Sequence, residues 1–314
     1  MCAGGSAYSA EPLPSAAQID AAIWARDVPT GVILSRIERI KLRFSELQPV
    51  THRQVLASEA ETLGEAGHFN AAQISVAELL SAAEAAHDET DQIRAHVLRA
   101  RISSLRGDTL GQLEAARLAV ALASSLNQPA LKSLAHQSLG IALFKHHQTE
   151  EAIRTLDLAR KEARESKDSL LEGQAYGALA RLNLEIYDNR RALQYIHEAQ
   201  RLLRPQKQEW ALAALLGSEA ITAGKPEDGY ESLPLLLQAY QRTHELGLHM
   251  AEQLTLVNLS DWHLTHRNWV QAIELSRRGL ALSLPGGNPL LPGLLNHNLG
   301  QALFATGRTI EGLA

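Results

Sequence analysis

Apolar residues recur at spacings of three and four along most of the 314-residue chain, which is the pattern of amphipathic α-helices. In one predicted helix they stand at Ile33, Ile37, Ile40, Phe44 and Leu47. Turn-forming Gly, Asn, Asp and Pro separate such segments. The pattern predicts helices throughout the chain, of which the first two cover residues 15–26, capped by Ser15, and 30–47.

The same pattern of small and apolar positions returns every 40 residues, as the likeness of residues 149–159 to 189–199 shows. Within each predicted helix pair, the first helix carries a small residue at a fixed place. These residues are Ala60, Ala100, Gly140, Ala180, Ala220, Ser260 and Gly300. Two helices can approach closely only where neither has a bulky side chain at the crossing. A fixed period of this length predicts a solenoid of antiparallel helix pairs.

The pattern divides the chain into three parts. Residues 1–14 are expected to be disordered, residues 15–50 to form an N-terminal helical cap, and residues 51–314 to form the repeat array. Thr51 and Gln54 have the spacing of a capping box that would open the array. The last repeat stops just inside its second helix, and we therefore expect the natural protein to continue beyond it.

Composition and motifs argue against several classes of function. The formal net charge is −5 and no basic stripe stands out, so nucleic-acid binding is not expected. The apolar stretches are too short to span a bilayer. The single cysteine, Cys2, excludes an internal disulfide, and His263 with His266 lacks a third ligand for a metal. Without a phosphate loop, nucleophile elbow or HExxH helix, we expect neither catalysis nor a cofactor.

The best-defined repeats run from Ser138 through Gly140 to Phe144, followed by Ala152, Leu156 and Ala159, and from Asn298 to Gly307. From Thr51 onward this pattern resembles the tetratricopeptide-repeat family, in a longer form similar to that of bacterial sensor and regulator proteins. The chain departs from the family where Gln112 and Ser232 replace the packing alanine. The resemblance implies an all-α, right-handed superhelix of about six and a half helix pairs after the cap.

In a superhelix of this family, the first helices of successive pairs line a concave groove. The candidate ligand-binding residues are Asn258, Asn298, Asp261, Gln301, Arg181 and Arg101. In tetratricopeptide domains that bind extended peptides, Asn at the place of Asn258 and Asn298 bonds to the ligand backbone. The two arginines could clamp a carboxylate. The alternative is that Asn before Leu-Gly is common in the family without a ligand, and that the arginines are ordinary solvated surface.

The resemblance implies a non-enzymatic recognition domain whose groove takes a peptide, a protein segment or a small ligand. It favours the N-terminal sensory part of a bacterial signalling protein with a diguanylate cyclase (GGDEF) or histidine kinase output. A cytoplasmic regulator preceding a helix-turn-helix DNA-binding domain, or a stand-alone interaction scaffold, is the alternative. A homodimer is compatible with either.

The first ten residues bear on the compartment. Ala7 and Ser9 are small residues at the spacing of a signal-peptide cleavage site, which favours the periplasm. A flexible terminus on a cytoplasmic protein is the alternative interpretation of the same residues.

Overall fold

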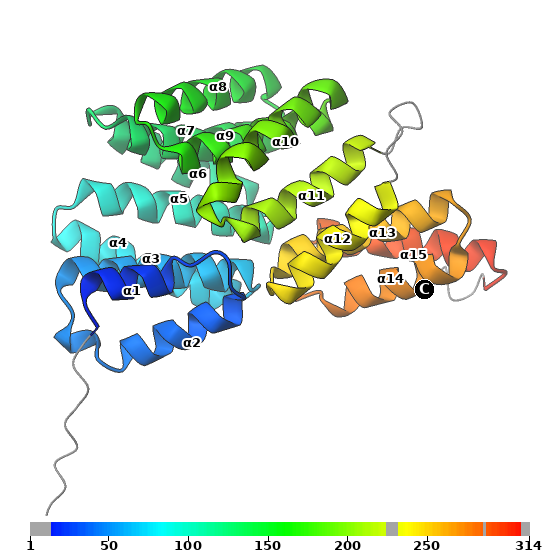
Figure 1. The fold of residues 1–314 in the computed structure, drawn as a ribbon, viewed down its shortest axis with the longest axis horizontal. Helices are drawn as coiled ribbons and strands as arrows, with labels where there is room; N and C mark the ends of the chain where they lie inside the picture. The colour runs from blue at the N-terminus through cyan, green and yellow to red at the C-terminus, as the bar shows by residue number, and fades with distance from the viewer. Residues whose placement is uncertain (1–13, 224–231, 285–286, 309–314) are drawn as a thin grey trace, which may run out of the picture.

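The computed structural model describes residues 14–223, 232–284 and 287–308, which form helices and no strand (Figure 1). The first cap helices and the turn after them are α1 (Ala16–Ile23), α2 (Thr30–Lys41) and the 3₁₀ turn η1 (Phe44–Glu46). The array follows as α3 (Pro49–Glu65), α4 (Phe69–Ala85), α5 (Glu89–Arg106), α6 (Thr109–Ser124), α7 (Pro129–Lys145), α8 (Thr149–Glu165), α9 (Ser169–Glu185), α10 (Asn189–Leu203), η2 (Arg204–Gln206), α11 (Glu209–Ala223), α12 (Ser232–Glu245), α13 (His249–Thr265), α14 (Trp269–Ala281) and α15 (Leu290–Ala305).

The helices stack as consecutive pairs, from α3 with α4 to α13 with α14, and α15 follows as a single described helix. Each odd-numbered helix from α3 to α15 also contacts the next odd-numbered helix, so these helices form one continuous inner layer. The all-α solenoid expected from the repeat is therefore confirmed. The inner layer is the one that lines the concave side of such an array.

Residues with a left-handed backbone end most of the helices at a constant interval. In the described chain they are Gly67, His87, Gly107, His147, Lys167, Tyr187, Lys207, Gly247, Arg267 and Gly307, whose numbers differ by 20 or by multiples of 20. A left-handed residue just after a helix closes its last turn and redirects the chain. Each helix with its turn thus occupies 20 residues, and the 40-residue period is one antiparallel pair.

The small residues at the helix crossings are required by close packing. All of the seven are buried except Gly300, which is half-buried. At Gly140 in α7, an added Cβ would lie 2.6 Å from Cγ of Leu156 in α8 and 3.3 Å from the carbonyl oxygen of Ala152. Because a backbone oxygen cannot move aside as a side chain can, this crossing has no room for a methyl group.

Gly140→Ala is therefore expected to destabilise the protein by about 1–3 kcal/mol through overpacking, although alanine favours a helix by about 1 kcal/mol. Gly217→Ala in α11 is the matched control, because among the described residues no atom outside the adjoining backbone of α11 lies within 4 Å of the added Cβ. It should stabilise the protein by about 0.5–1 kcal/mol. Urea unfolding followed by circular dichroism measures both. Equal stability of Gly140→Ala and the wild type would contradict the packing argument.

Two predicted helix ends differ from the structure. The second helix ends at Lys41 and not at Leu47, and the 3₁₀ turn η1 follows it. The first array helix begins at Pro49, so Thr51 lies buried in its first turn and does not cap it. The fixed φ of proline suits the first helical position, and this preference outweighs the capping-box spacing. The expected disorder of the first residues lies outside the described chain, apart from Pro14.

The N-terminal cap docks on a part of the array that is distant in sequence. The backbone N–H of Thr30 donates to the carbonyl of Leu246 at 2.9 Å, and its hydroxyl donates to the carbonyl of Gly247 at 3.1 Å. Trp210 Nε1 of α11 donates to the carbonyl of Val28 at 2.9 Å. Apolar side chains of both regions form one core: Ile19, Ile23, Ile33, Ile37, Val55, Trp210, Ala213, Leu246 and Leu248. The cap thus joins α3 to the α11–α13 region.

Candidate functional site

One residue from each inner helix forms a row along the inner layer. This inner row consists of Glu61, Arg101, Ile141, Arg181, Ile221, Asp261 and Gln301, each one position after the small residue of its helix. Its first two members meet across the helices, since Arg101 Nη1 of α5 donates to Glu61 Oε1 of α3 at 3.0 Å. Most of the row is exposed, and Ile221 is 49% exposed. The row therefore offers a largely accessible strip in which the two isoleucines stand on either side of Arg181 among charged and polar side chains.

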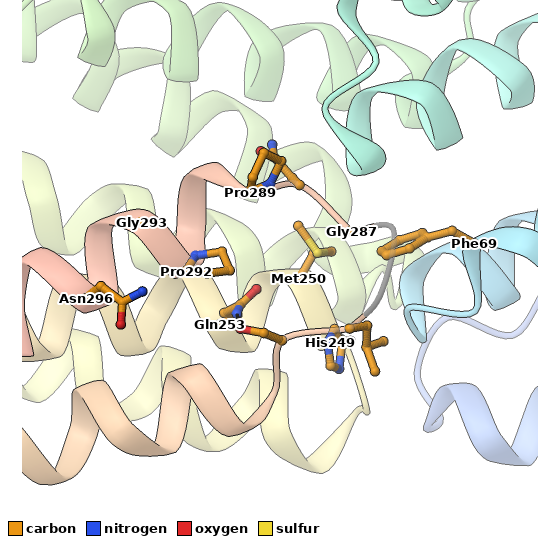
Figure 2. Close-up of a pocket in the computed structure, with 12 residues that line it drawn as sticks. Phe69, His249, Met250, Gln253, Gly287, Pro289, Pro292, Gly293 and Asn296 are labelled. Atoms are coloured by element: carbon orange, nitrogen blue, oxygen red, sulfur yellow. Dashed lines mark hydrogen bonds between the residues drawn. The ribbon is translucent and has the colours of Figure 1, made fainter. Parts of the chain in front are cut away.

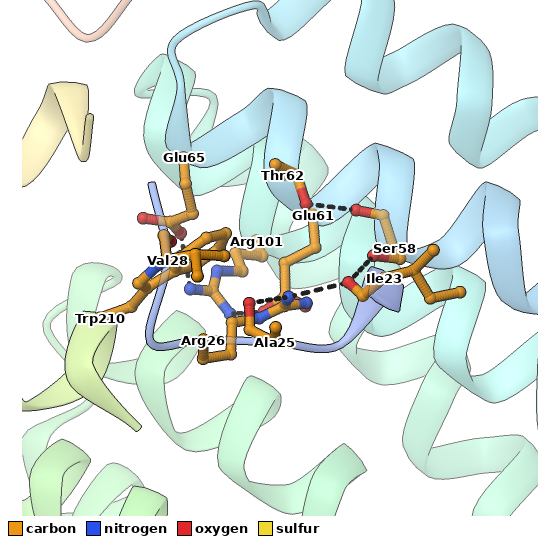
Figure 3. Close-up of polar contacts among 10 residues, drawn as sticks. All are labelled: Ile23, Ala25, Arg26, Val28, Ser58, Glu61, Thr62, Glu65, Arg101 and Trp210. Atoms are coloured by element: carbon orange, nitrogen blue, oxygen red, sulfur yellow. Dashed lines mark hydrogen bonds and ion pairs between the residues drawn. The ribbon is translucent and has the colours of Figure 1, made fainter. Parts of the chain in front are cut away.

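At its first end the inner row is neutralised by ion pairs. Glu61 accepts from Arg26 Nη2 at 2.6 Å as well as from Arg101, and Arg101 Nη2 donates to Glu65 Oε1 at 2.6 Å. Figure 3 shows both arginines converging on Glu61. Burial would raise the pKa of the Glu61 carboxyl, but the charges of Arg26 and Arg101 outweigh it and hold the pKa below its ordinary value. These four groups are mutually satisfied.

Arg181 of α9 has no such partner. Among the described residues it makes no hydrogen bond and no ion pair, although it is exposed to water. The surrounding helices displace bulk water from the guanidinium, and the positive charge of Arg101 adds to this, so the pKa of Arg181 is lowered despite weaker opposing fields from Glu185 and Glu65. No direct partner among the described residues therefore neutralises Arg181, although Glu185 and Glu65 offset part of its charge, and the position favours an anion.

A shallow hollow adjoins Arg181. It is lined by residues of α7, α8 and α9, namely Ile141, Phe144, Lys145, Leu156, Ala178, Arg181, Leu182 and Glu185. On the row itself, Arg181 stands between Ile141 and Ile221 of the adjacent inner helices. The cation thus has an isoleucine on each neighbouring inner helix, while Lys145 and Glu185 add charge to the hollow beside it.

The two candidate asparagines have different environments. Asn298 is 5% exposed, and its Nδ2 donates to Ser260 Oγ at 2.7 Å and to the carbonyl of Val257 at 3.3 Å. This amide joins α15 to α13, so it does not present a free donor to the groove. Asn258 is half-buried and forms no side-chain hydrogen bond with the described residues. The two asparagines, equivalent in the repeat, are therefore not equivalent in their contacts.

The other candidate residues are accessible. Asp261 and Gln301 are exposed at the far end of the inner row, and Gln301 Nε2 lies 2.8 Å from Nε2 of His297 one turn earlier. Arg101 is half-exposed but engaged by Glu61 and Glu65. Of the three charged residues among the six predicted from the sequence, Arg101 is paired, whereas Arg181 and Asp261 have no ion pair among the described residues.

A separate pocket of about 410 Å³ lies where the array returns to its first pair (Figure 2). Phe69 at the start of α4 faces His249 and Met250 of α13 and Pro292 of α15 across it. The approach is close, because a Cβ on Gly67 would lie 2.6 Å from Cδ1 of Leu284. Burial lowers the pKa of His249, which favours the neutral imidazole. The repeat pattern does not predict this pocket, because Phe69 and His249 belong to repeats that are far apart in the sequence.

A metal cluster and a membrane-spanning helix are both absent from the described residues. Within them, no group of three or more His, Cys, Asp or Glu side chains could hold a metal ion. In the same ranges, no helix is both long and apolar enough to cross a membrane.

Comparison with protein-family models and with curated proteins finds no match. Solved structures with a similar fold include the apo form of RapI, with a TM-score of 0.58 and 14% identity over 81% of this chain and 91% of that one. A Rap protein complexed with competence and sporulation factor has a TM-score of 0.58 and 13% identity over 89% of this chain and 79% of the other. Aspartyl phosphate phosphatase F from Bacillus subtilis has a TM-score of 0.59 and 13% identity over 82% of this chain and 67% of that one. At these identities the likeness concerns the fold alone.

Proposed function

We propose that this protein binds an extended segment of a peptide or partner protein along the inner row, and that Arg181 pairs with an acidic group of that segment. The observation that carries the proposal is that Arg181, within the inner layer, has no direct partner among the described residues. A guanidinium that has already lost part of its hydration gains more from a bidentate carboxylate than a fully solvated one does.

The flanking residues define the rest of the ligand. Neighbouring inner helices lie about 8–10 Å apart, and an extended chain advances about 3.3 Å per residue, so every third ligand residue meets the next helix. Ile141 and Ile221 stand on the helices on either side of Arg181. The ligand would therefore carry an aspartate or glutamate with apolar residues about three positions before and after it.

The proposal is one of recognition and not of catalysis. The inner row supplies charges and aliphatic side chains, but none of its members is a nucleophile placed next to a base. A fold of this kind has been solved with a bound factor, competence and sporulation factor in a Rap protein, which supports the use of such a groove for binding. The phosphatase activity in the name of phosphatase F is not carried over to this chain, because the two are only 13% identical.

The wider context stays a prediction from the repeat resemblance. A sensory domain ahead of a diguanylate cyclase or histidine kinase, in the periplasm, is one context in which the groove would work. A cytoplasmic regulator or a stand-alone scaffold would use the same groove.

The groove can be tested with an array of heptapeptides that carry Asp or Glu at the centre and apolar residues at both ends. Matched peptides carry Asn or Gln at the centre. The acidic peptides are expected to bind more tightly, and Arg181→Ala should weaken them about tenfold or more, since hydrogen bonds to charged groups contribute about 1.5–3 kcal/mol. Affinity is measured by fluorescence anisotropy.

Arg154→Ala is the matched control, because Arg154 is a 72% exposed arginine of α8, outside the inner layer. It should leave the affinity for the acidic peptides unchanged. If acidic and amide peptides bind alike, or if Arg181→Ala binds the acidic peptides as the wild type does, the assignment of Arg181 is wrong.

A further inference from the structure

The six residues between α1 and α2 lie across the groove. This bridging segment, residues 24–29, is not helical. On one side its Arg26 reaches Glu61 of α3, and on the other its Val28 carbonyl accepts from Trp210 of α11. Figure 3 shows Arg26 between the Trp210 ring and Glu61, with Arg101 of α5 close by. The chain's own segment thus spans two inner helices that belong to distant repeats.

The environment of Arg26 has the features of a binding site for arginine. The guanidinium is 7% exposed, donates to Glu61 Oε2 at 2.6 Å and lies 4.5 Å from the ring centroid of Trp210. Its other terminal nitrogen donates to the carbonyls of Ile23 at 3.1 Å and Ala25 at 3.4 Å. A carboxylate in the plane and an aromatic ring over the face are the two groups that select arginine over lysine.

The backbone around Arg26 is also recognised. Ser58 Oγ of α3 donates to the carbonyl of Ile23 at 2.6 Å, and Trp210 Nε1 donates to the carbonyl of Val28 at 2.9 Å. Thr30 continues the contact with its two hydrogen bonds to Leu246 and Gly247. Hydrogen bonds to main-chain carbonyls together with one buried side chain are the way in which an extended peptide is held.

We infer that the groove between α3 and α11 is a binding site for an arginine-bearing, non-helical segment, and that residues 24–29, which bend at Trp24, Asp27 and Val28, fill it as an intramolecular ligand. The partner would be a protein segment with arginine preceded by a small and an aromatic residue, like Trp24, Ala25 and Arg26. It would displace the bridging segment and take its place on Glu61 and Trp210. The inference rests on the proposed function, because it treats the inner layer as a surface for peptide segments.

Tethering decides how strongly the bridging segment competes. A segment held at both ends by α1 and α2 has an effective concentration of the order of millimolar or more at its site. An added peptide of the same sequence therefore binds the wild type weakly. Any change that loosens the bridging segment without altering Glu61 or Trp210 should raise the affinity of the added peptide.

The test uses the full chain and a fluorescein-labelled peptide with the sequence of residues 23–30, measured by anisotropy. Arg26→Ala is expected to bind this peptide at least tenfold more tightly than the wild type, because the arginine site is vacated. Arg36→Ala is the matched control, since Arg36 also lies in the cap and donates to the carbonyl of Ala22 at 3.1 Å, without an interaction with Glu61. It should bind as the wild type does. A peptide with citrulline in place of arginine should bind Arg26→Ala at least tenfold more weakly.

A second variant decides the matter if Arg26→Ala does not fold. Thr30→Val removes the hydroxyl that donates to Gly247 but leaves Arg26 and its partners in place. It should raise the affinity for the peptide by a smaller factor, about threefold, which corresponds to about 0.6 kcal/mol. The inference is overturned if neither folded variant binds the peptide more tightly than the wild type, or if the citrulline peptide binds as well as the arginine peptide.

The two hypotheses fail separately. Arg181→Ala should not change the affinity of Arg26→Ala for the arginine peptide, because Arg181 belongs to α9 and takes no part in the contacts of Arg26. Loss of the acidic-peptide preference alone would reject the role of Arg181. Loss of the arginine-peptide binding alone would reject the intramolecular ligand.

Discussion

Trp210→Ala is expected to lower the free energy of unfolding by about 3–5 kcal/mol, the range for removing a buried tryptophan. Trp210 is 7% exposed and packs with Ile23 and Leu246 in the core shared by the cap and the array. Its indole also donates to the Val28 carbonyl and covers the guanidinium of Arg26. Truncation removes all three contacts at once and leaves Arg26 with only the more exposed Trp24 as an aromatic neighbour.

Trp24→Ala provides the control, because Trp24 also lies over Arg26, at 5.1 Å, but is 36% exposed. Its removal should cost about 1 kcal/mol or less. Urea unfolding gives the stabilities, and limited proteolysis reports whether residues 24–29 become accessible. If the two substitutions lower the free energy of unfolding equally, docking of the cap does not depend on the buried core around Trp210.

Arg53→Ala should destabilise the protein by about 3 kcal/mol, near the lower end of the range for breaking a buried ion pair. Arg53 of α3 is 5% exposed, and it donates from Nε to Asp91 Oδ2 and from Nη2 to Asp88 Oδ2, each at 2.7 Å. The hydrogen bond to Asp91 is the main cause of the raised pKa of the Arg53 guanidinium. Without the arginine, the buried carboxylate of Asp91 keeps only an outer partner.

That outer partner supplies the control. Arg94 lies 3.3 Å from Asp91 Oδ1 and is 47% exposed, so Arg94→Ala should cost less than about 1 kcal/mol. Thermal and urea unfolding compare the two variants directly. Similar losses for Arg53→Ala and Arg94→Ala would show that the burial of Arg53 does not govern its contribution.

The helix pairs could be predicted from the sequence because their determinants are local. The small residue at each crossing, such as Gly140, stands at a fixed distance from the alanine of the next helix, and this spacing repeats. The left-handed conformation of several turns could not be predicted in the same way. His147, Lys167 and Tyr187 have a positive φ, which residues other than glycine rarely adopt. There the register of two well-packed helices determines the turn.

The site was predictable in part. Repeat register placed Arg101 and Arg181 on one row, but it could not tell that Glu61 and Glu65 pair with Arg101 and that Arg181 is left without a partner. Asn298 is equivalent to Asn258 in the repeat, yet its amide donates to the hydroxyl of Ser260 on the preceding inner helix. Contacts between distant repeats, such as Trp210 with Val28, depend on small rotations summed over many pairs and have no local signature.

The docking of the cap changes how the array should unfold. An open solenoid behaves as a chain of neighbours and can fray from its ends. Here a hydrogen bond between Thr30 and Gly247 links residues 217 positions apart, and the same interface contains a buried core. Opening the array at that interface therefore breaks long-range and local contacts together. We expect α1 to α13 to unfold cooperatively. During folding, the backbone amides of the cap should gain full protection from hydrogen exchange only after the residues near Gly247 have folded.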